Sequence, residues 1–139
     1  MLDWLLDVVL PVRCEAPEFG SLRYLRQVRW WEGKGRFQGA AIEWLVHAPR
    51  SGPDAQQAAF VRELADRYAS MLPGIERAMR STVDDEGLVQ PASLQLAHIE
   101  VPAIPGSEAR WSMSYDGLPE RTLEVMMIGW AVADVVVAR

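Results

Sequence analysis

The sequence predicts an α+β fold in which one long helix packs on one face of an antiparallel sheet. Three observations lead to this prediction. Segment 53–85 places apolar residues at spacings of three and four, the period of one helix face. The segments before and after it alternate apolar and polar residues, or are bounded by glycine and proline, as strands are. A helix with one apolar stripe must cover another surface, and these strands supply it.

Length and composition are those of one globular domain, expected over 1–139. No apolar run approaches the roughly 20 residues that cross a bilayer. The first residues lack the basic start and the cleavage pattern of a signal peptide. The single cysteine, Cys14, can form no internal disulfide, and we interpret it as a bystander in a loop. These observations favour a cytoplasmic protein without a membrane partner.

Charge is distributed unevenly along the chain, whose net charge is −5. Residues 82–139 contain three basic and nine acidic side chains, so this third alone carries −6. The acidic excess argues against a nucleic-acid partner and leaves an acidic surface for a basic protein. The basic residues are 13 arginines and one lysine, which we take as typical of a bacterial genome rich in G and C.

The N-terminal part begins with an ambiguous segment. Residues 1–10 fit an edge strand over 6–10, or a short helix that buries Leu2, Leu5, Leu6 and Val9. Pro11 and Pro17 then bracket an irregular link, because proline removes a backbone donor and restricts the residue before it.

An N-terminal hairpin or meander is expected next. Strands are predicted over 19–24, 27–31 and 36–47, with a tight turn at the two glycines of 32–35. Because successive side chains on a strand point to opposite faces, the last strand has a core face and a second face. The core face holds Ile42, Trp44 and Val46. The second face holds Glu43, Leu45 and His47.

The helix has a clear start and an internal interruption. Asp54 followed three residues later by Gln57 resembles a capping box, in which each side chain binds the other's backbone N–H. Pro73 costs about 3 kcal/mol in a helix interior unless the helix kinks or restarts. We therefore expect a Pro-kinked helix in two pieces, 54–72 and 73–83.

A C-terminal meander follows the helix. Strands are predicted over 94–101, 110–116, 122–128 and 131–137, with a turn at 116–119. The second of these shows the clearest alternation, with Trp111, Met113 and Tyr115 on one face. The expected core is Leu22, Ile42, Trp44, Val46, Val61, Leu64, Tyr68, Leu72, Ile75, Trp111, Met113, Tyr115, Leu123 and Val125.

Several short motifs occur in a recognisable order. Phe-Gly-Ser-Leu-Arg-Tyr at 19–24 precedes the helix, and Trp111-x-Met-x-Tyr115 and Leu123-x-Val125 follow it. This order resembles a group of small bacterial domains of unknown function that open with Phe-Gly-x-Leu-x-Tyr. Some members are found among immunity proteins encoded beside secreted toxins. The resemblance covers most of the chain from residue 19 onward, and it implies a fold and a class of partner but no catalytic residues.

Two histidines offer the best candidates for chemistry. The sequence contains no phosphate loop, nucleophile elbow, His-Glu-x-x-His or Cys-x-x-Cys motif. Glu43 and His47 share a strand face, as do His98 and Glu100, because each pair is an even number of residues apart. If their strands were neighbours, the four side chains could converge on a divalent metal. The alternative is two unrelated surface histidines, and we assign no catalytic residue and no cofactor.

Basic and aromatic residues are interleaved between positions 13 and 37. Trp30 and Trp31 must point to opposite faces of a strand, so one can lie outside the helix-covered layer. An exposed tryptophan beside arginine has the composition of an interface hot spot. The partner-binding candidates are Arg29, Trp30, Trp31, Lys34 and Arg36.

These observations support three hypotheses about function. The first is a non-enzymatic protein-interaction domain, with a toxin-immunity protein that binds a basic toxin as one candidate class. The second is a metal-dependent or novel small-molecule enzyme that uses His47 and His98. The third is a homodimeric module that binds a small ligand.

Overall fold

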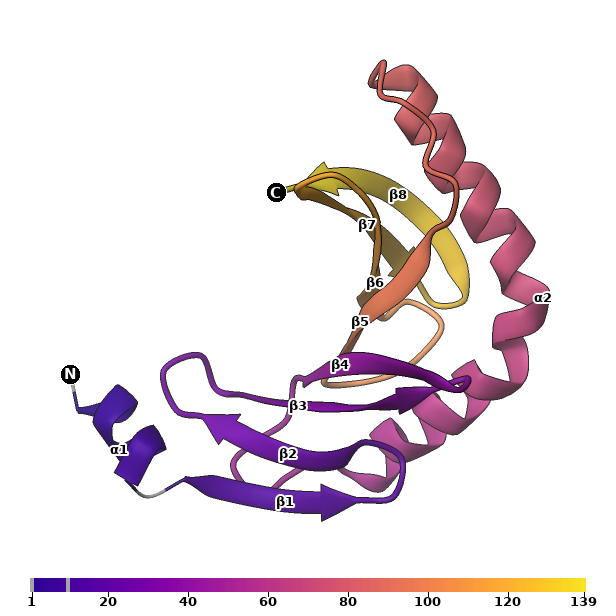
Figure 1. Cartoon of the computed structure of the whole chain (residues 1–139). Coiled ribbons are helices and arrows are strands. Elements are labelled where there is room, and N and C mark those ends of the chain that lie inside the picture. The colour runs from indigo at the N-terminus through magenta and orange to yellow at the C-terminus, as the bar shows by residue number, and fades with distance from the viewer. Residues whose placement is uncertain (1, 10) are drawn as a thin grey trace.

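The computed structural model describes residues 2–9 and 11–139, which form two helices and one eight-stranded sheet (Figure 1). The helices are α1 (Asp3–Val9) and α2 (Ala55–Asp85). The first four strands are β1 (Val12–Ala16), β2 (Gly20–Leu25), β3 (Trp30–Phe37) and β4 (Ala40–Val46). The last four are β5 (Gln95–Val101), β6 (Arg110–Leu118), β7 (Arg121–Ile128) and β8 (Ala131–Ala138).

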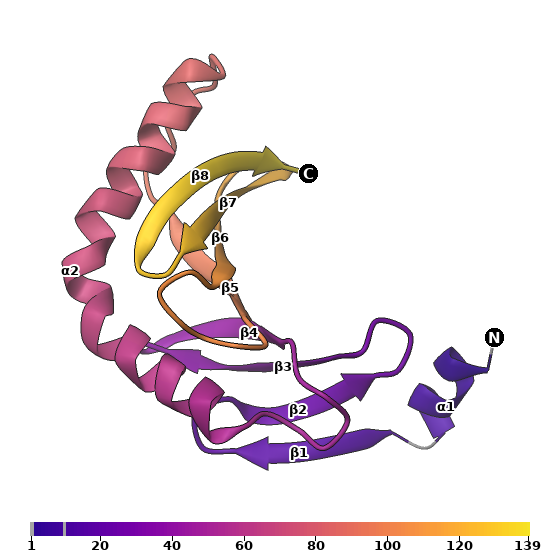
Figure 2. The same cartoon turned by 180° about the vertical axis from the view of Figure 1, so that it is seen from behind.

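The order of the strands in the sheet is their order in the sequence. Neighbouring strands are antiparallel except β4 and β5, which are parallel because α2 connects them as a crossover. The two predicted meanders, β1–β4 and β5–β8, are therefore halves of one sheet, and the α+β class is confirmed. Both views show the elements in an arc with α2 along its outer side (Figure 1 and Figure 2).

The core joins side chains of α2 to side chains of the sheet. The Phe60 and Trp111 rings are nearly perpendicular, with centroids 5.0 Å apart, and the Tyr68 and Tyr115 hydroxyl oxygens are 2.6 Å apart. Every residue of the expected core is buried except Leu72, which is half-buried. The strand residues in this core alternate with those of the opposite face of the sheet, which we call the open face.

The start of α2 is as predicted, and its middle is not. The Gln57 backbone N–H donates to Asp54 Oδ1 at 2.8 Å, and the Asp54 N–H donates to Gln57 Oε1 at 3.1 Å. The two pieces expected from Pro73 are instead a single helix of 31 residues. Pro73 is exposed, so water can solvate the carbonyl that loses its N–H partner.

The expected turn at 32–35 is wrong, because both glycines lie inside β3. A Cβ on Gly33 would lie 2.1 Å from the Ser21 carbonyl oxygen, and one on Gly35 would lie 2.6 Å from the Phe19 carbonyl oxygen. The glycines therefore permit a close backbone approach inside the sheet. The actual turn is Gln38–Gly39, where both residues have positive φ, as a tight hairpin turn requires.

The N-terminal segment also differs from expectation. The helical alternative for residues 1–10 is correct, but Leu2, Leu5 and Leu6 of this segment are exposed rather than buried. The side chain of Val9 lies outside the described residues. The expected irregular link is largely β1, and Cys14 lies in this strand with its side chain half-buried against the core, not in a loop. Neither described helix is long and apolar enough to cross a membrane.

One C-terminal turn is displaced. β6 continues to Leu118 through an irregularity between Asp116 and Leu118, so the turn expected at 116–119 falls at Pro119 and Glu120. Gly117 has a φ of 153°, and a Cβ there would lie 2.4 Å from the Ser93 carbonyl oxygen. The aspartate and glycine therefore mark a bulge rather than a turn.

Candidate functional site

The parallel pairing of β4 and β5 brings the two histidines together with the two glutamates. Glu43 is the register partner of His98, and Leu45 is the partner of Glu100. His98 Nε2 lies 3.0 Å from Glu43 Oε2, and His47 Nε2 lies 2.5 Å from Glu100 Oε1. The even spacing within each strand predicts which residues share a face. The crossover through α2 then places β4 and β5 side by side, so that each histidine pairs with a glutamate of the other strand.

The pair of His47 and Glu100 has further partners. The His47 and Trp30 rings lie nearly perpendicular to each other, with centroids 5.7 Å apart. The Ser112 hydroxyl donates to Glu100 Oε2 at 3.0 Å. The side chains of His47 and Glu100 are 38% and 37% exposed, so both remain accessible from solvent. The Glu100 carboxylate therefore accepts one hydrogen bond from His47 and one from Ser112, and these bonds fix its orientation.

His47, Glu100 and Ser112 do not form a catalytic triad, because the carboxylate lies between the serine and the histidine. A serine nucleophile needs a base on its own hydroxyl, and that base in turn needs an orienting acid. Here Ser112 donates to the carboxylate rather than to the imidazole, and the serine is 3% exposed. The arrangement can accept or donate hydrogen bonds to a docked molecule through His47 and Glu100.

The metal hypothesis requires the four side chains to converge at one point. The described residues contain no group of three or more His, Cys, Asp or Glu side chains that could hold a metal ion. Glu43 with His98 and His47 with Glu100 are two separate pairs, displaced by four residues on the β4 side and by two residues along β5. Each pair supplies two ligand residues, fewer than the three protein ligands of an ordinary catalytic zinc site.

A second cluster lies beside these pairs on the open face. A hollow of about 270 Å³ is lined by Arg13, Ser21, Arg23, Glu32, Gly33, Lys34 and Glu43. Arg13 and Arg23 are direct register partners on β1 and β2. Arg23 forms an ion pair with Glu32 at 3.4 Å. The β1–β3 part of the open face is therefore locally basic, and it adjoins the acidic side chains of Glu43 and Glu100.

The predicted partner-binding residues divide into two groups. Trp31 is 1% exposed and donates its indole N–H to the Pro49 carbonyl at 2.8 Å, so assigning it to a binding surface is a mistake. Strand alternation sends Trp30 to the open face instead, where it is partly exposed. Arg29, Lys34 and Arg36 are exposed, and Arg36 donates to the Gly39 carbonyl at 2.8 Å.

Sequence reasoning does not single out Glu32 or Ser112, and it includes Arg13 and Arg23 only as members of the basic and aromatic run at 13–37. Their grouping depends on the register between β1, β2 and β3 and between β5 and β6, which no local motif specifies. Like charges placed directly opposite on neighbouring strands are unfavourable. The register pair of Arg13 and Arg23 therefore places two like charges opposite each other, which becomes visible only once the pairing is known.

The environment of Cys14 does not favour a nucleophilic thiolate. Burial raises the pKa of the Cys14 thiol, and the negative charge of Glu15 raises it further. The thiolate is the reactive form of cysteine. The thiol therefore stays protonated near neutral pH.

Comparisons with known proteins were also made. No protein-family model, no curated protein and no solved structure matches this chain.

Proposed function

We propose that this chain is a non-enzymatic protein-interaction domain that binds a partner protein through the open face of its sheet. The observation that supports this most directly is Trp30 beside His47 on a face that carries accessible charged pairs. Interface hot spots are enriched in tryptophan and arginine surrounded by polar residues. The open face brings these residue types together over β2 to β5.

The charged pairs of this face contribute little to folding. Exposed ion pairs are worth about 0–1 kcal/mol, because water screens them and both side chains lose freedom. His98 and Glu43 are 50% and 43% exposed, and Arg23 and Glu32 are 41% and 31% exposed. Such groups gain more from a partner that excludes water and presents complementary charge.

The charge layout defines the chemistry of the partner. Arg13, Arg23 and Lys34 lie on β1–β3, whereas Glu43 and Glu100 lie on β4 and β5. A partner that fits places acidic groups over the first part and basic groups over the second. A basic toxin bound by an immunity protein is the class that we propose, on the resemblance to domains of that kind and on the acidic C-terminal third.

The test is capture of a partner from the source cells, followed by affinity measurement with variants of the open face. Trp30→Ala removes the aromatic anchor, and Lys34→Glu reverses a charge in the hollow. The matched control is Arg77→Glu on α2, an exposed arginine away from this face. Trp31→Ala is avoided, because it would disturb the core.

A hot-spot tryptophan costs 2 kcal/mol or more when truncated, so Trp30→Ala should weaken binding at least about 30-fold. Lys34→Glu should mainly change the association rate and its dependence on salt. Arg77→Glu should bind as the wild type does. Equal affinities for all three variants, each with an unchanged melting temperature, would rule out the open face as the binding surface.

A further inference from the structure

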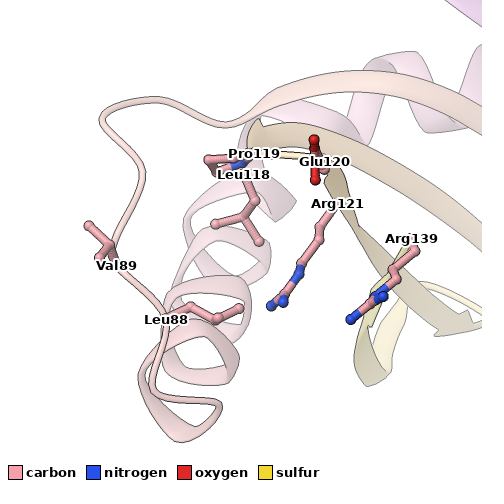
Figure 3. A pocket seen from close by; sticks show the side chains of 7 residues that line it. All are labelled: Leu88, Val89, Leu118, Pro119, Glu120, Arg121 and Arg139. Carbon is pink, nitrogen blue, oxygen red and sulfur yellow. The ribbon is translucent and has the colours of Figure 1, made fainter.

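A pocket of about 400 Å³ lies at one end of the core, away from the open face (Figure 3). It is bounded by the segment after α2, the β6–β7 turn and the end of β8. Leu88 and Leu118 form an apolar wall, Val89 lies at its rim with its side chain turned outward, and Arg121 and Arg139 extend their guanidinium groups from the sheet side. The pocket therefore combines a hydrophobic surface with a strongly cationic end.

The two arginines are placed next to each other by strand register. Thr122 on β7 pairs with Ala138 on β8, so the adjacent Arg121 and Arg139 face each other across the two strands. Like charges in this arrangement repel each other. The described residues provide neither guanidinium group with a hydrogen bond or ion pair. In Figure 3 the Glu120 carboxylate lies near the start of the Arg121 side chain, apart from the guanidinium ends of both arginines.

The charge distribution makes this grouping notable. Residues 82–139 hold nine acidic side chains and only three basic ones, and two of those three line this pocket. Acidic partners are therefore abundant in this part of the sequence. Glu86 lines an adjoining hollow with both arginines, yet it pairs with neither.

The apolar wall is also incompletely covered. Val89 is 89% exposed, an unfavourable position for a branched apolar side chain, and Leu88 is only partly buried. Covering apolar surface gains roughly 25 cal/mol for each Å² removed from water. An occupant with an apolar portion would cover these side chains.

We propose that this pocket binds a small monocarboxylic acid with an apolar tail. The carboxylate lies between Arg121 and Arg139, which relieves their repulsion and forms charge-assisted hydrogen bonds. The tail lies against Leu88 and Leu118, beside Val89 at the rim. The volume is at the lower end of the range for small-molecule sites, about 300–1,000 Å³, and so suits a medium-chain acid. This proposal does not depend on the function assigned to the open face.

Titration with octanoate tests the proposal, with octanamide as a neutral probe of the same shape. Amide chemical shifts of the protein report the position of binding, and calorimetry reports the affinity. Octanoate should bind with one-to-one stoichiometry and shift the amide signals of Leu88, Val89 and Leu118. Octanamide should bind at least about tenfold more weakly, because a hydrogen bond to a charged group is worth more than a neutral one. Equal binding of the two probes would overturn the proposal.

Variants of the arginines separate a binding role from a structural one. Arg121→Gln and Arg139→Gln should each weaken octanoate binding about tenfold, with no fall in melting temperature, because each relieves repulsion in the empty pocket. Arg110→Gln is the control, since Arg110 is the third arginine of this acidic region and does not line the pocket. Unchanged octanoate binding in Arg121→Gln and Arg139→Gln would overturn the proposal. If these variants also had a lower melting temperature, the arginines would have a structural role instead.

Discussion

The hydroxyl oxygens of Tyr68 on α2 and Tyr115 on β6 lie 2.6 Å apart inside the core. Each tyrosine is buried, and each hydroxyl is the hydrogen-bond partner of the other. Because neither group can reach water easily, the bond ties the middle of α2 to the centre of the sheet.

Removing either hydroxyl should destabilise the fold by about 1–2 kcal/mol, because the remaining hydroxyl loses its partner while buried. Tyr68→Phe and Tyr115→Phe should therefore lower the midpoint of urea unfolding by similar amounts. Tyr24→Phe is the control, since this buried tyrosine has a ring contact with Trp31 but, among the described residues, no hydrogen bond from its hydroxyl. A loss in Tyr24→Phe as large as in the other two would show that the hydrogen bond is not the cause.

The same pair should make the fold sensitive to alkali. Burial raises the pKa of Tyr115, and the hydrogen bond and the proximity of Tyr68 raise it further. Burial also raises the pKa of Tyr68, although its hydrogen bond to Tyr115 acts in the opposite direction. In the unfolded chain a tyrosine ionises near pH 10.

Above that pH the unfolded chain binds fewer protons than the folded one, so stability falls as pH rises. The stabilisation that comes from keeping these tyrosines protonated is fully present below about pH 10. Above that pH, each tyrosine lowers the free energy of unfolding by up to about 1.4 kcal/mol per pH unit. Unfolding free energies measured between pH 9 and 12 should show this decline, and Tyr115→Phe should make it shallower. A decline of the same slope in Tyr115→Phe would contradict the assignment.

Two glycines give opposite predictions for the same substitution. A Cβ on Gly35 would lie 2.6 Å from the Phe19 carbonyl oxygen and 2.7 Å from the Trp44 indole nitrogen, so Gly35→Ala must displace backbone or a core ring. We expect a loss of about 1–3 kcal/mol from such overpacking. Gly74 lies within α2 with only the Arg77 guanidinium near, at 3.6 Å. Gly74→Ala should stabilise the protein by up to about 1 kcal/mol. Melting temperatures that move in the same direction for both variants would refute this explanation of Gly35.

Gly35 and Gln57 show what the sequence can and cannot reveal. The capping box of Asp54 and Gln57 depends on residues three apart, so its motif is sufficient to predict it. The reason for Gly35 lies in Phe19 and Trp44, which are distant in sequence, and its local pattern is that of a turn. Periodicity similarly predicts the faces of β4 and β6, because it is a property of one strand.

The candidate sites depend almost entirely on pairing between strands. Parity places His47 and His98 on faces of their own strands, but the pairs with Glu100 and Glu43 follow from a parallel register. Arg121 and Arg139 are 18 positions apart in the sequence, share no motif, and meet because β7 and β8 form a hairpin. Register arises from the summed packing of the sheet, so single-residue patterns carry little information about it.

Gln57 has a second role that the capping motif does not predict. Its side-chain N–H groups donate to the His47 carbonyl at 2.8 Å and to the Pro102 carbonyl at 3.0 Å, and the residue is 1% exposed. Gln57 therefore joins the start of α2 to the ends of β4 and β5. Gln57→Ala should cost about 2–4 kcal/mol, because it leaves buried carbonyls without donors. Gln56→Ala changes an exposed neighbour in the same helical turn and should cost less than about 0.5 kcal/mol. Chemical denaturation of the two variants measures the difference, and similar losses would contradict the role of Gln57.

The free edge of the sheet at β8 is apolar apart from one aspartate, Asp134. The strand reads Ala-Val-Ala-Asp-Val-Val-Val-Ala, and Val132 and Val136 are 36% and 43% exposed. An exposed apolar edge strand is a template for pairing with another chain. Two features oppose such pairing here. A register shift leaves Ala133 without a partner, and Asp134 Oδ1 accepts the backbone N–H of Val135 at 2.8 Å.

Asp134→Val removes the charge and the acceptor together, so it should increase self-association, seen as a higher mass in light scattering at the same protein concentration. Asp134→Asn keeps an oxygen that can accept the Val135 N–H but removes the charge, and it should give an intermediate result. If Asp134→Asn associates as strongly as Asp134→Val, the charge alone protects the edge. If neither variant changes the mass, the bulge at Ala133 is sufficient, because the bulge twists the strand away from a flat partner.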